Sequence, residues 1–211
     1  CVYSTGTNCT AAENLRVAGE LDGPDDVIYQ TYGPEMVDTT EHRLLSLSVA
    51  EQAMTLLKND GSLLPLKKTA KVAFIGPQAN FTQEMLSNYE GQNLLVNNHS
   101  TIMAAKRQGI SFTYSPGHSS DVSSTDKSMI PAAVATARAA DVAVVMVGLC
   151  ADHCAGNGRT ENEGNDRGPG GSGWHTLGLP GAQEALLEAV FAANPRTVLV
   201  MINGLSSESV C

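Results

Sequence analysis

The sequence lacks the features that mark membrane, nucleic-acid and nucleotide-binding proteins. No apolar run approaches the roughly 20 residues that a transmembrane helix requires. Lys and Arg number 13 against 22 Asp and Glu, and the formal net charge is −9, whereas a nucleic-acid partner requires a basic face. The glycine-rich run 168–173 lacks the Gly-Lys-Ser/Thr ending of a phosphate-binding loop. We therefore expect a globular protein with neither a membrane span nor a nucleic-acid partner.

Cysteine is scarce and is absent from the apolar periodic segments. The cysteines stand at positions 1, 9, 150, 154 and 211. Acceptor triplets for N-glycosylation begin at Asn8, Asn80 and Asn98. Loop cysteines together with such triplets favour an oxidising compartment, so we expect a secreted or luminal glycoprotein with disulfides. The odd number of cysteines leaves one thiol free or paired with another chain.

Apolar segments of strand and helix type alternate from residue 71 onward. The patterns predict strands at 71–76, 110–114, 142–149 and 197–202. They predict helices at 41–58, 82–87, 101–107, 128–140 and 182–193. This alternation is typical of an α/β domain with a mostly parallel sheet. Residues 1–40 have no sustained period and contain scattered Gly and Pro, which predicts an extended linker.

The most apolar of these strands runs directly toward the densest charged cluster of the chain. Residues 142–149 are almost continuously apolar, which is typical of a central strand covered on both faces. The cluster that follows consists of Glu161, Glu163, Asp166 and Arg167. Because ligands of open α/β sheets bind at the carboxyl ends of the strands, we expect the chemistry of the protein here.

Several motifs, in order along residues 16–204, resemble glycoside hydrolase family 3. They are TEHR at 40–43, LLKNDGSLLPL at 56–66, VAFIGPQAN at 72–80, NYEG at 88–91, EGNDR at 163–167 and LPGAQ at 179–183. The NYEG element is most similar to the β-xylosidase branch of the family. The resemblance implies a three-layer α/β/α sandwich, which in this family follows a (β/α)8 barrel and a linker.

By this resemblance the chain is a part of a larger enzyme. Residues 1–40 are similar to the tail of the barrel and the interdomain linker, and residues 41–211 to an incomplete sandwich. No segment matches the barrel, which carries the nucleophilic Asp and most sugar-binding residues. The chain also stops soon after the strand that we predict at 197–202, and an uncovered hydrophobic sheet face is costly. We therefore expect the barrel domain or a partner chain to complete the fold.

The resemblance also assigns roles within the charged cluster. Retaining glycosidases use two carboxyl groups about 5–5.5 Å apart, one as nucleophile and one as general acid/base. In this family a loop of the sandwich supplies the acid/base, and Glu163 fits its Glu-Gly-x-Asp-Arg pattern. Glu161 lies two residues earlier and could serve instead. We expect Asp166 and Arg167 to position the loop.

Simpler interpretations of the same loop stay open. The charged residues could form a solvated loop without chemistry. Cys150, His153 and Cys154 could ligate a metal, but three ligands fit zinc poorly and disulfides are favoured, so we expect no metal and no cofactor. Trp174 is a candidate sugar contact or a packing residue. We expect the histidines other than His153 at the surface or as helix caps; they are His42, His99, His118 and His175.

Two hypotheses of function follow. In the first, the chain is part of a secreted retaining β-glycosidase that hydrolyses terminal β-linked xylose or glucose from oligosaccharides, polysaccharides or glycosides. This chain would supply the acid/base loop and would be inactive alone. In the second, it is a non-catalytic module of an extracellular assembly, since insertions at 150–158 and 168–173 flank the proposed acid.

Overall fold

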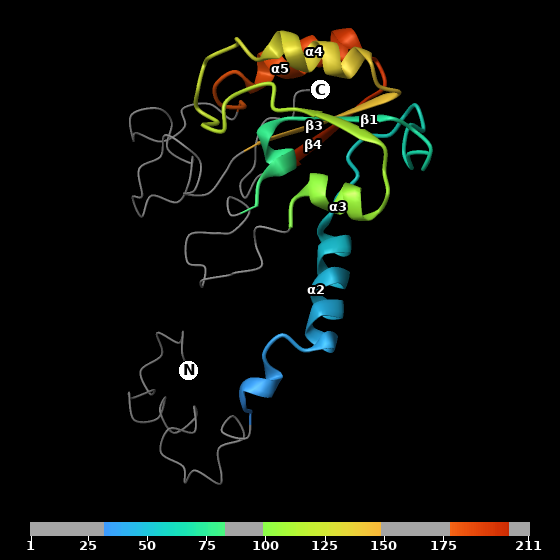
Figure 1. The fold of residues 1–211 in the computed structure, drawn as a ribbon, viewed down its shortest axis with the longest axis vertical. Coiled ribbons are helices and arrows are strands. Elements are labelled where there is room, and N and C mark those ends of the chain that lie inside the picture. Colours follow the sequence, from blue (N-terminus) through green and yellow to red (C-terminus); the bar gives the residue numbers. More distant parts are fainter. Residues whose placement is uncertain (1–31, 83–98, 149–177, 203–211) are drawn as a thin grey trace, which may run out of the picture. The chain divides into compact units, whose positions relative to one another are not determined.

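The computed structural model describes residues 32–82, 99–148 and 178–202 (Figure 1). The chain divides into two compact units, residues 1–58 and residues 59–211. The predicted helix at 82–87 lies outside the described residues, apart from its first residue. The predicted division of the chain at residue 40 stays a prediction.

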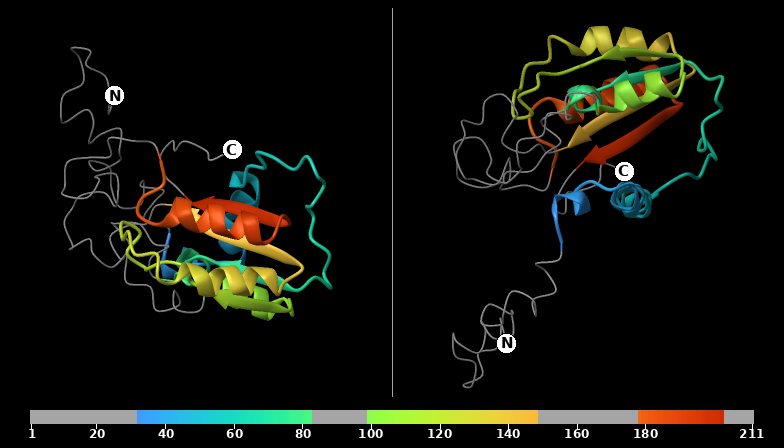
Figure 2. Two further views of the ribbon diagram at one scale, coloured as in Figure 1. Left: turned by 90° about the horizontal axis from the view of Figure 1, so that it is seen from above. Right: turned by 60° about the horizontal axis from the view of Figure 1, so that its bottom comes forward.

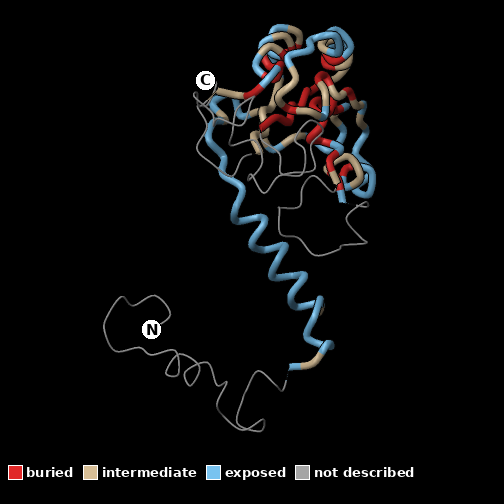
Figure 3. The backbone as a smooth tube through the Cα atoms, turned by 90° about the vertical axis from the view of Figure 1, so that its left-hand side faces the viewer, coloured by how far each residue is buried: buried red, intermediate tan, exposed pale blue. Residues whose placement is uncertain are grey.

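The described part of the first unit consists of a 3-10 turn, η2 (Pro34–Met36), and one helix, α2 (Thr40–Ala53). The helix starts where the sequence predicts, and the side chain of Thr39 caps it by accepting a hydrogen bond from the backbone N of His42 at 3.2 Å. The predicted extension to Lys58 is wrong. The helix ends at Ala53, because Met54 has an extended backbone (φ −74°, ψ 123°), and the residues of α2 are themselves exposed (Figure 3).

The second unit contains four strands and three α-helices among its described residues. The strands are β1 (Val72–Ile75), β2 (Phe112–Ser115), β3 (Val142–Gly148) and β4 (Thr197–Ile202). The helices are α3 (Thr101–Arg107), α4 (Ile130–Arg138) and α5 (Gln183–Ala193), with a 3-10 turn, η3 (Pro77–Asn80), after β1. The four predicted strands and the predicted helices at 101–107, 128–140 and 182–193 are confirmed, with ends that differ by a few residues. The turn η3 was not predicted.

The strands form one sheet in the order β2-β1-β3-β4, and every pair is parallel. The predicted α/β fold with a parallel sheet is therefore confirmed. Along the chain, β2 is added on one side of β1, and β3 and β4 are then added on the other side. The strand order thus reverses between β1 and β3, and a crevice outside the carboxyl ends of these two strands is where such sheets bind ligands.

Both faces of the sheet are covered, which gives three layers (Figures 1 and 2). On one face, side chains of β1 and β3 pack against α4 and α5; this core includes Ile75, Val145, Val147, Leu186 and Val190. On the other face, alternate side chains of the same strands pack against α3, η3 and the segment before β1; this core includes Phe74, Val144, Met146, Ala79 and Ala105. The alternation explains why the central strands are apolar at successive positions.

Strand β4 is less protected than its neighbour. All seven residues of β3 are buried, whereas all six residues of β4 are only half-buried. Among the described strands, β4 pairs with β3 alone. Within the part of the chain that the structure describes, its outer backbone edge is therefore that of an unpaired edge strand.

Candidate functional site at the carboxyl edge of the sheet

The predicted catalytic residues lie outside the described residues. This holds for Glu161, Glu163, Asp166, Arg167 and Trp174, all within the segment 149–177, and for the five cysteines and the acceptors Asn8 and Asn98. What the structure describes is the surface at which that segment begins and ends. This surface is the carboxyl edge of the sheet, from Gly148 to residues 178–183.

Two glycines allow neighbouring strands to approach closely at this edge. Gly76, directly after β1, has φ +107°, and a Cβ placed there would lie 1.9 Å from the carbonyl oxygen of Met146. Gly148, the last residue of β3, has φ +140°, and a Cβ there would lie 1.9 Å from the carbonyl oxygen of Ile202. Any side chain at either position would both clash and strain the backbone. The close approach of the neighbouring strands at the ends of β1 and β3 therefore requires glycine at both positions.

Two buried glutamines converge on the backbone of Gly148. Gln183, the first residue of α5, accepts a hydrogen bond from the Gly148 N–H at 2.7 Å and donates one to the Gly148 carbonyl at 3.0 Å. Gln78 of η3 donates to the same carbonyl at a longer distance, 3.5 Å. Gln183 is 0% exposed and Gln78 is 1% exposed. Side chains from η3 and α5 therefore meet at the residue from which the charged segment departs.

The chain also returns to the domain in a defined conformation. Gly181 has φ +62°, and a Cβ there would lie 2.5 Å from the carbonyl oxygens of both Val122 and Ser124. The next residue, Ala182, donates its backbone N–H to the Ser124 carbonyl at 2.9 Å. The residues directly before α5 are thus held against the loop that follows β2. The residues that flank the segment 149–177, Gly148 on one side and Gly181 and Ala182 on the other, are thus both held within the sheet domain.

The carboxyl end of β2 leads to a buried histidine. His118 is 1% exposed, so its expected position at the surface is wrong, whereas the expected exposure of His42 and His99 is confirmed. Its Nδ1–H donates to the Ser119 carbonyl at 2.6 Å. Burial lowers the pKa of His118 from 6.5 to about 4, although the bond to Ser119 acts in the opposite direction. The imidazole is therefore neutral near pH 7.

Two polar atoms at this edge have no hydrogen-bond partner in the described structure. They are Oε1 of Gln78 and Nε2 of His118. Nε2 is an acceptor, because Nδ1 carries the proton of the neutral ring. Sequence reasoning missed both glutamines and the burial of His118. The one sign in the sequence that the two glutamines matter is their place within motifs, since Gln78 lies in VAFIGPQAN and Gln183 in LPGAQ.

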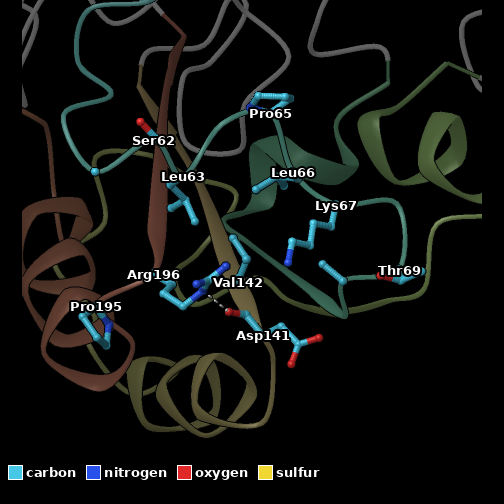
Figure 4. Close-up of a pocket in the computed structure, with 12 residues that line it drawn as sticks. Ser62, Leu63, Pro65, Leu66, Lys67, Thr69, Asp141, Val142, Pro195 and Arg196 are labelled. Atoms are coloured by element: carbon cyan, nitrogen blue, oxygen red, sulfur yellow. Dashed lines mark hydrogen bonds between the residues drawn. The ribbon is translucent and has the colours of Figure 1, made fainter.

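A groove of about 690 Å³ lies at the opposite, amino edge of the sheet (Figure 4). Residues of the segments 61–70, 141–142 and 195–196 line it. Among those lining residues Asp141 has the one carboxylate, which accepts a hydrogen bond from the Lys71 backbone N at 2.8 Å, while its carbonyl accepts one from Arg196 Nε at 3.1 Å. A retaining glycosidase needs two carboxyl groups, so the groove lacks the chemistry of such a site.

The described residues contain no group of three His, Cys, Asp or Glu side chains arranged to hold a metal ion. No described helix has the length and apolarity to cross a membrane. Asn80, the one predicted glycosylation acceptor within the described residues, is exposed, and its Oδ1 accepts a hydrogen bond from Ser100 Oγ at 3.4 Å. Its modification stays a prediction.

Comparisons with known proteins agree with the fold. The family model "Glycosyl hydrolase family 3 C-terminal domain" matches residues 54–208. A probable exo-1,4-β-xylosidase, bxlB, of Aspergillus terreus is 31% identical over 186 residues, which cover 88% of this chain and 22% of the relative. β-D-Xylosidase 3 of Arabidopsis thaliana is 35% identical over 190 residues, with the same coverage of 88% and 22%.

A solved structure extends this similarity. The GH3 β-glucosidase of Bifidobacterium adolescentis superposes with a TM-score of 0.66 at 26% identity, over 96% of this chain and 30% of that protein. The chain spans about a fifth of the length of the curated relatives it matches, 22% in both cases. The similarity therefore concerns one domain of larger proteins.

Proposed function

The chain belongs to glycoside hydrolase family 3 through its C-terminal domain, and from this premise we propose that it forms the acid/base-bearing part of a secreted retaining β-glycosidase. The observation that carries the proposal is the place where β3 ends. The charged cluster follows β3 in the sequence, and β3 ends beside the point where the strand order reverses. That edge is where an α/β sheet presents groups to a ligand.

In the proposed reaction Glu163 acts first as an acid and then as a base. It donates its proton to the glycosidic oxygen while a carboxylate of another domain attacks the anomeric carbon, so that the leaving group departs as an alcohol. The Glu163 carboxylate then takes a proton from the water that hydrolyses the glycosyl-enzyme intermediate, which restores both carboxyl groups. Glu161 is the alternative acid, Asp166 and Arg167 position the loop, and Trp174 is a candidate contact for the sugar ring.

The partners in this proposal are a carbohydrate and a barrel. The β-xylosidase names of the two sequence relatives support terminal β-linked xylose as the substrate, and the β-glucosidase structure supports glucose as the alternative. The nucleophile belongs to a barrel domain or partner chain, so this chain alone is inactive. Two carboxyl groups suffice for the reaction, and the proposal includes no cofactor. Secretion rests on the acceptor triplets and loop cysteines.

Leaving-group dependence tests the role of Glu163. In the intact protein we expect Glu163→Gln to lower kcat/KM on a phenyl β-xyloside at least about 100-fold, because the phenolate needs protonation as it leaves. A 2,4-dinitrophenyl β-xyloside has a leaving group that needs little protonation, so its glycosylation step should change far less. Added azide, which attacks without a general base, should restore turnover of that substrate.

Glu161→Gln is the matched control for this experiment. Wild-type rates in Glu163→Gln, together with the leaving-group effect in Glu161→Gln, would assign the acid to Glu161. Wild-type rates in both variants would overturn the catalytic proposal. Absence of hydrolysis in the wild-type intact protein would favour the alternative function, a non-catalytic module, which the insertions at 150–158 and 168–173 support.

A further inference from the structure

The amino edge of the sheet is basic, although the chain as a whole is acidic. The formal net charge of the chain is −9. The segment before β1 nevertheless contains Lys67, Lys68 and Lys71, and Arg196 directly precedes β4. All four side chains are exposed. Among the residues that line the groove at this edge, Asp141 has the one carboxylate. The charge of this edge is therefore opposite in sign to that of the chain.

The basic residues are spread along the edge. The backbone N–H of Asp141 donates to the Lys71 carbonyl at 2.9 Å, and that of Ala143 donates to the Arg196 carbonyl at 3.1 Å. Lys71 and Arg196 thus lie on either side of the start of β3. Because neighbouring strands are about 4.8 Å apart, the backbones of Lys71 and Arg196 are about 10 Å apart. The side chains of Lys67 and Arg196 point toward each other across the groove (Figure 4). The cations therefore form a row.

The structure does not neutralise these cations. Lys67, Lys68 and Lys71 form no ion pair with a described residue. Arg196 donates from Nε to the Asp141 carbonyl at 3.1 Å, which leaves its charge uncompensated. Basic residues in the last turns of α3 and α4 complement the helix dipoles. The three lysines before β1 belong to no helix, so a helix dipole does not explain them. A row of exposed and unpaired cations attracts a ligand with several negative charges.

The other residues of the groove indicate which kind of anion fits. No lining residue is aromatic, whereas single-stranded nucleic acids bind by stacking their bases on aromatic rings. Neutral sugars also favour aromatic rings, so recognition here depends on charge. The hydroxyl groups of Ser62 and Thr69 line the same groove and supply hydrogen-bond partners for sugar hydroxyls. Carboxylates at regular intervals on a chain of sugars match both features.

We infer that the amino edge, through Lys67, Lys68, Lys71 and Arg196, binds an acidic polysaccharide with carboxylates on successive sugars. The choice of a polysaccharide over another polyanion rests on the proposed function. Strand β3 has seven residues at about 3.3 Å each, which places this edge about 20 Å from the carboxyl edge. A polymer bound here leaves the proposed reactive edge open. It would hold the enzyme on carbohydrate material without competing with hydrolysis.

Isothermal titration calorimetry of the intact protein with polygalacturonate tests this binding. At 50 mM salt we expect Lys67→Gln to weaken binding about 3-fold, and the triple variant Lys67→Gln, Lys68→Gln and Lys71→Gln to weaken it at least about 10-fold. Lys67→Arg keeps the charge and should bind like wild type. Raising the salt to 200 mM should weaken wild-type binding at least about 10-fold, because the contacts are ionic.

Lys127→Gln is the matched control. Lys127 is exposed in the loop before α4, so this variant makes the same change of net charge away from the amino edge. It should bind polygalacturonate like wild type. A loss in Lys127→Gln equal to that in Lys67→Gln would show that only net charge matters and would overturn the site.

Further outcomes decide the ligand class. Equal or tighter binding of polyglutamate of the same length would favour an acidic protein partner and overturn the polysaccharide. Unchanged binding in the triple variant, or no binding by the intact wild-type protein, would overturn the inference as a whole. Glu163→Gln should bind polygalacturonate like wild type, since the measurement does not depend on catalysis. Wild-type hydrolysis by Glu163→Gln would instead remove the proposed role of Glu163 and leave the binding result intact.

Discussion

At the scale of single residues, His118 is the clearest case of a side chain whose environment changes its chemistry. The ring is buried and its Nε2 has no partner among the described residues. Protonation would place an uncompensated charge in this site, which is why burial lowers the pKa of His118 to about 4. In the unfolded chain the pKa returns to about 6.5, so between these two values the unfolded state binds more protons.

Stability should therefore fall as the pH drops through this window. The contribution of a neutral His118 is fully present above pH 6.5 and is lost progressively toward pH 4. Linkage gives a loss of about 2 kcal/mol in the free energy of unfolding between pH 7.5 and pH 5. We expect His118→Gln, which cannot titrate, to remove this part of the pH dependence in urea denaturation. The exposed His42→Gln serves as the control and should retain it; a wild-type slope in His118→Gln would contradict the assignment.

At the scale of elements, the helices α4 and α5 are joined at their carboxyl ends by one side chain. Asn194, directly after α5, donates through Nδ2 to the carbonyls of Ala137 at 2.9 Å and Ala140 at 3.2 Å. Its Oδ1 accepts from the Arg196 backbone N at 2.9 Å. The Ala137 carbonyl in the last turn of α4, which also accepts the Ala140 backbone N–H at 3.3 Å, and the Ala140 carbonyl just after the helix are thus bonded from the neighbouring element. Asn194 is also buried.

We expect Asn194→Ala to destabilise the domain by about 2 kcal/mol, because it removes three hydrogen bonds made by a buried side chain. The free energy of unfolding from urea denaturation measures this loss. Thr136→Val on α4 is the control, since the bond from Thr136 Oγ1 to the Ala132 carbonyl is solvent-exposed. Its effect should stay below about 0.5 kcal/mol. Equal effects of the two variants would show that Asn194 has no special role.

At the scale of the whole molecule, the described structure leaves apolar surface uncovered. The outer edge of β4 has no strand beside it among the described residues. Large apolar side chains of the first unit are also exposed; they include Leu44, Leu45, Leu47, Val49, Leu56 and Leu57. For the first unit taken by itself, exposed apolar side chains in this number are typical of a surface that packs against further polypeptide. The share of the relatives that the chain covers, 22%, agrees with this interpretation.

The intact mass of the native protein tests this expectation directly. The chain itself accounts for 22.1 kDa. A single polypeptide several times heavier would supply the barrel that the catalytic proposal requires, whereas a native species of about this mass would contradict it. Enzymatic removal of N-glycans should lower the measured mass if the acceptor triplets are used. An unchanged mass would remove the support that the triplets give to secretion.

Local patterns predicted the secondary structure well and the ends of elements less well. The strand at 142–149 was evident because β-branched residues buried on both faces form a continuous apolar run. The end of α2 was misplaced because apolar residues continue to Leu57 at near-helical spacing, whereas the backbone is already extended at Met54. The turn η3 was missed, since a Pro-initiated 3-10 turn has no periodic signal.

The sequence by itself determined the fold class, the family, and the edge of the sheet at which the charged segment begins. Each of these depends on apolar periodicity, turn residues or contiguous motifs, which are local properties of the chain. Only the tertiary structure decided the strand order, the burial of His118 and the meeting of Gln78 and Gln183 at Gly148. The hydrogen bonds of Gln78 and Gln183 to Gly148, for example, join residues 70 and 35 positions apart. Packing between such distant segments leaves no periodic pattern in the sequence.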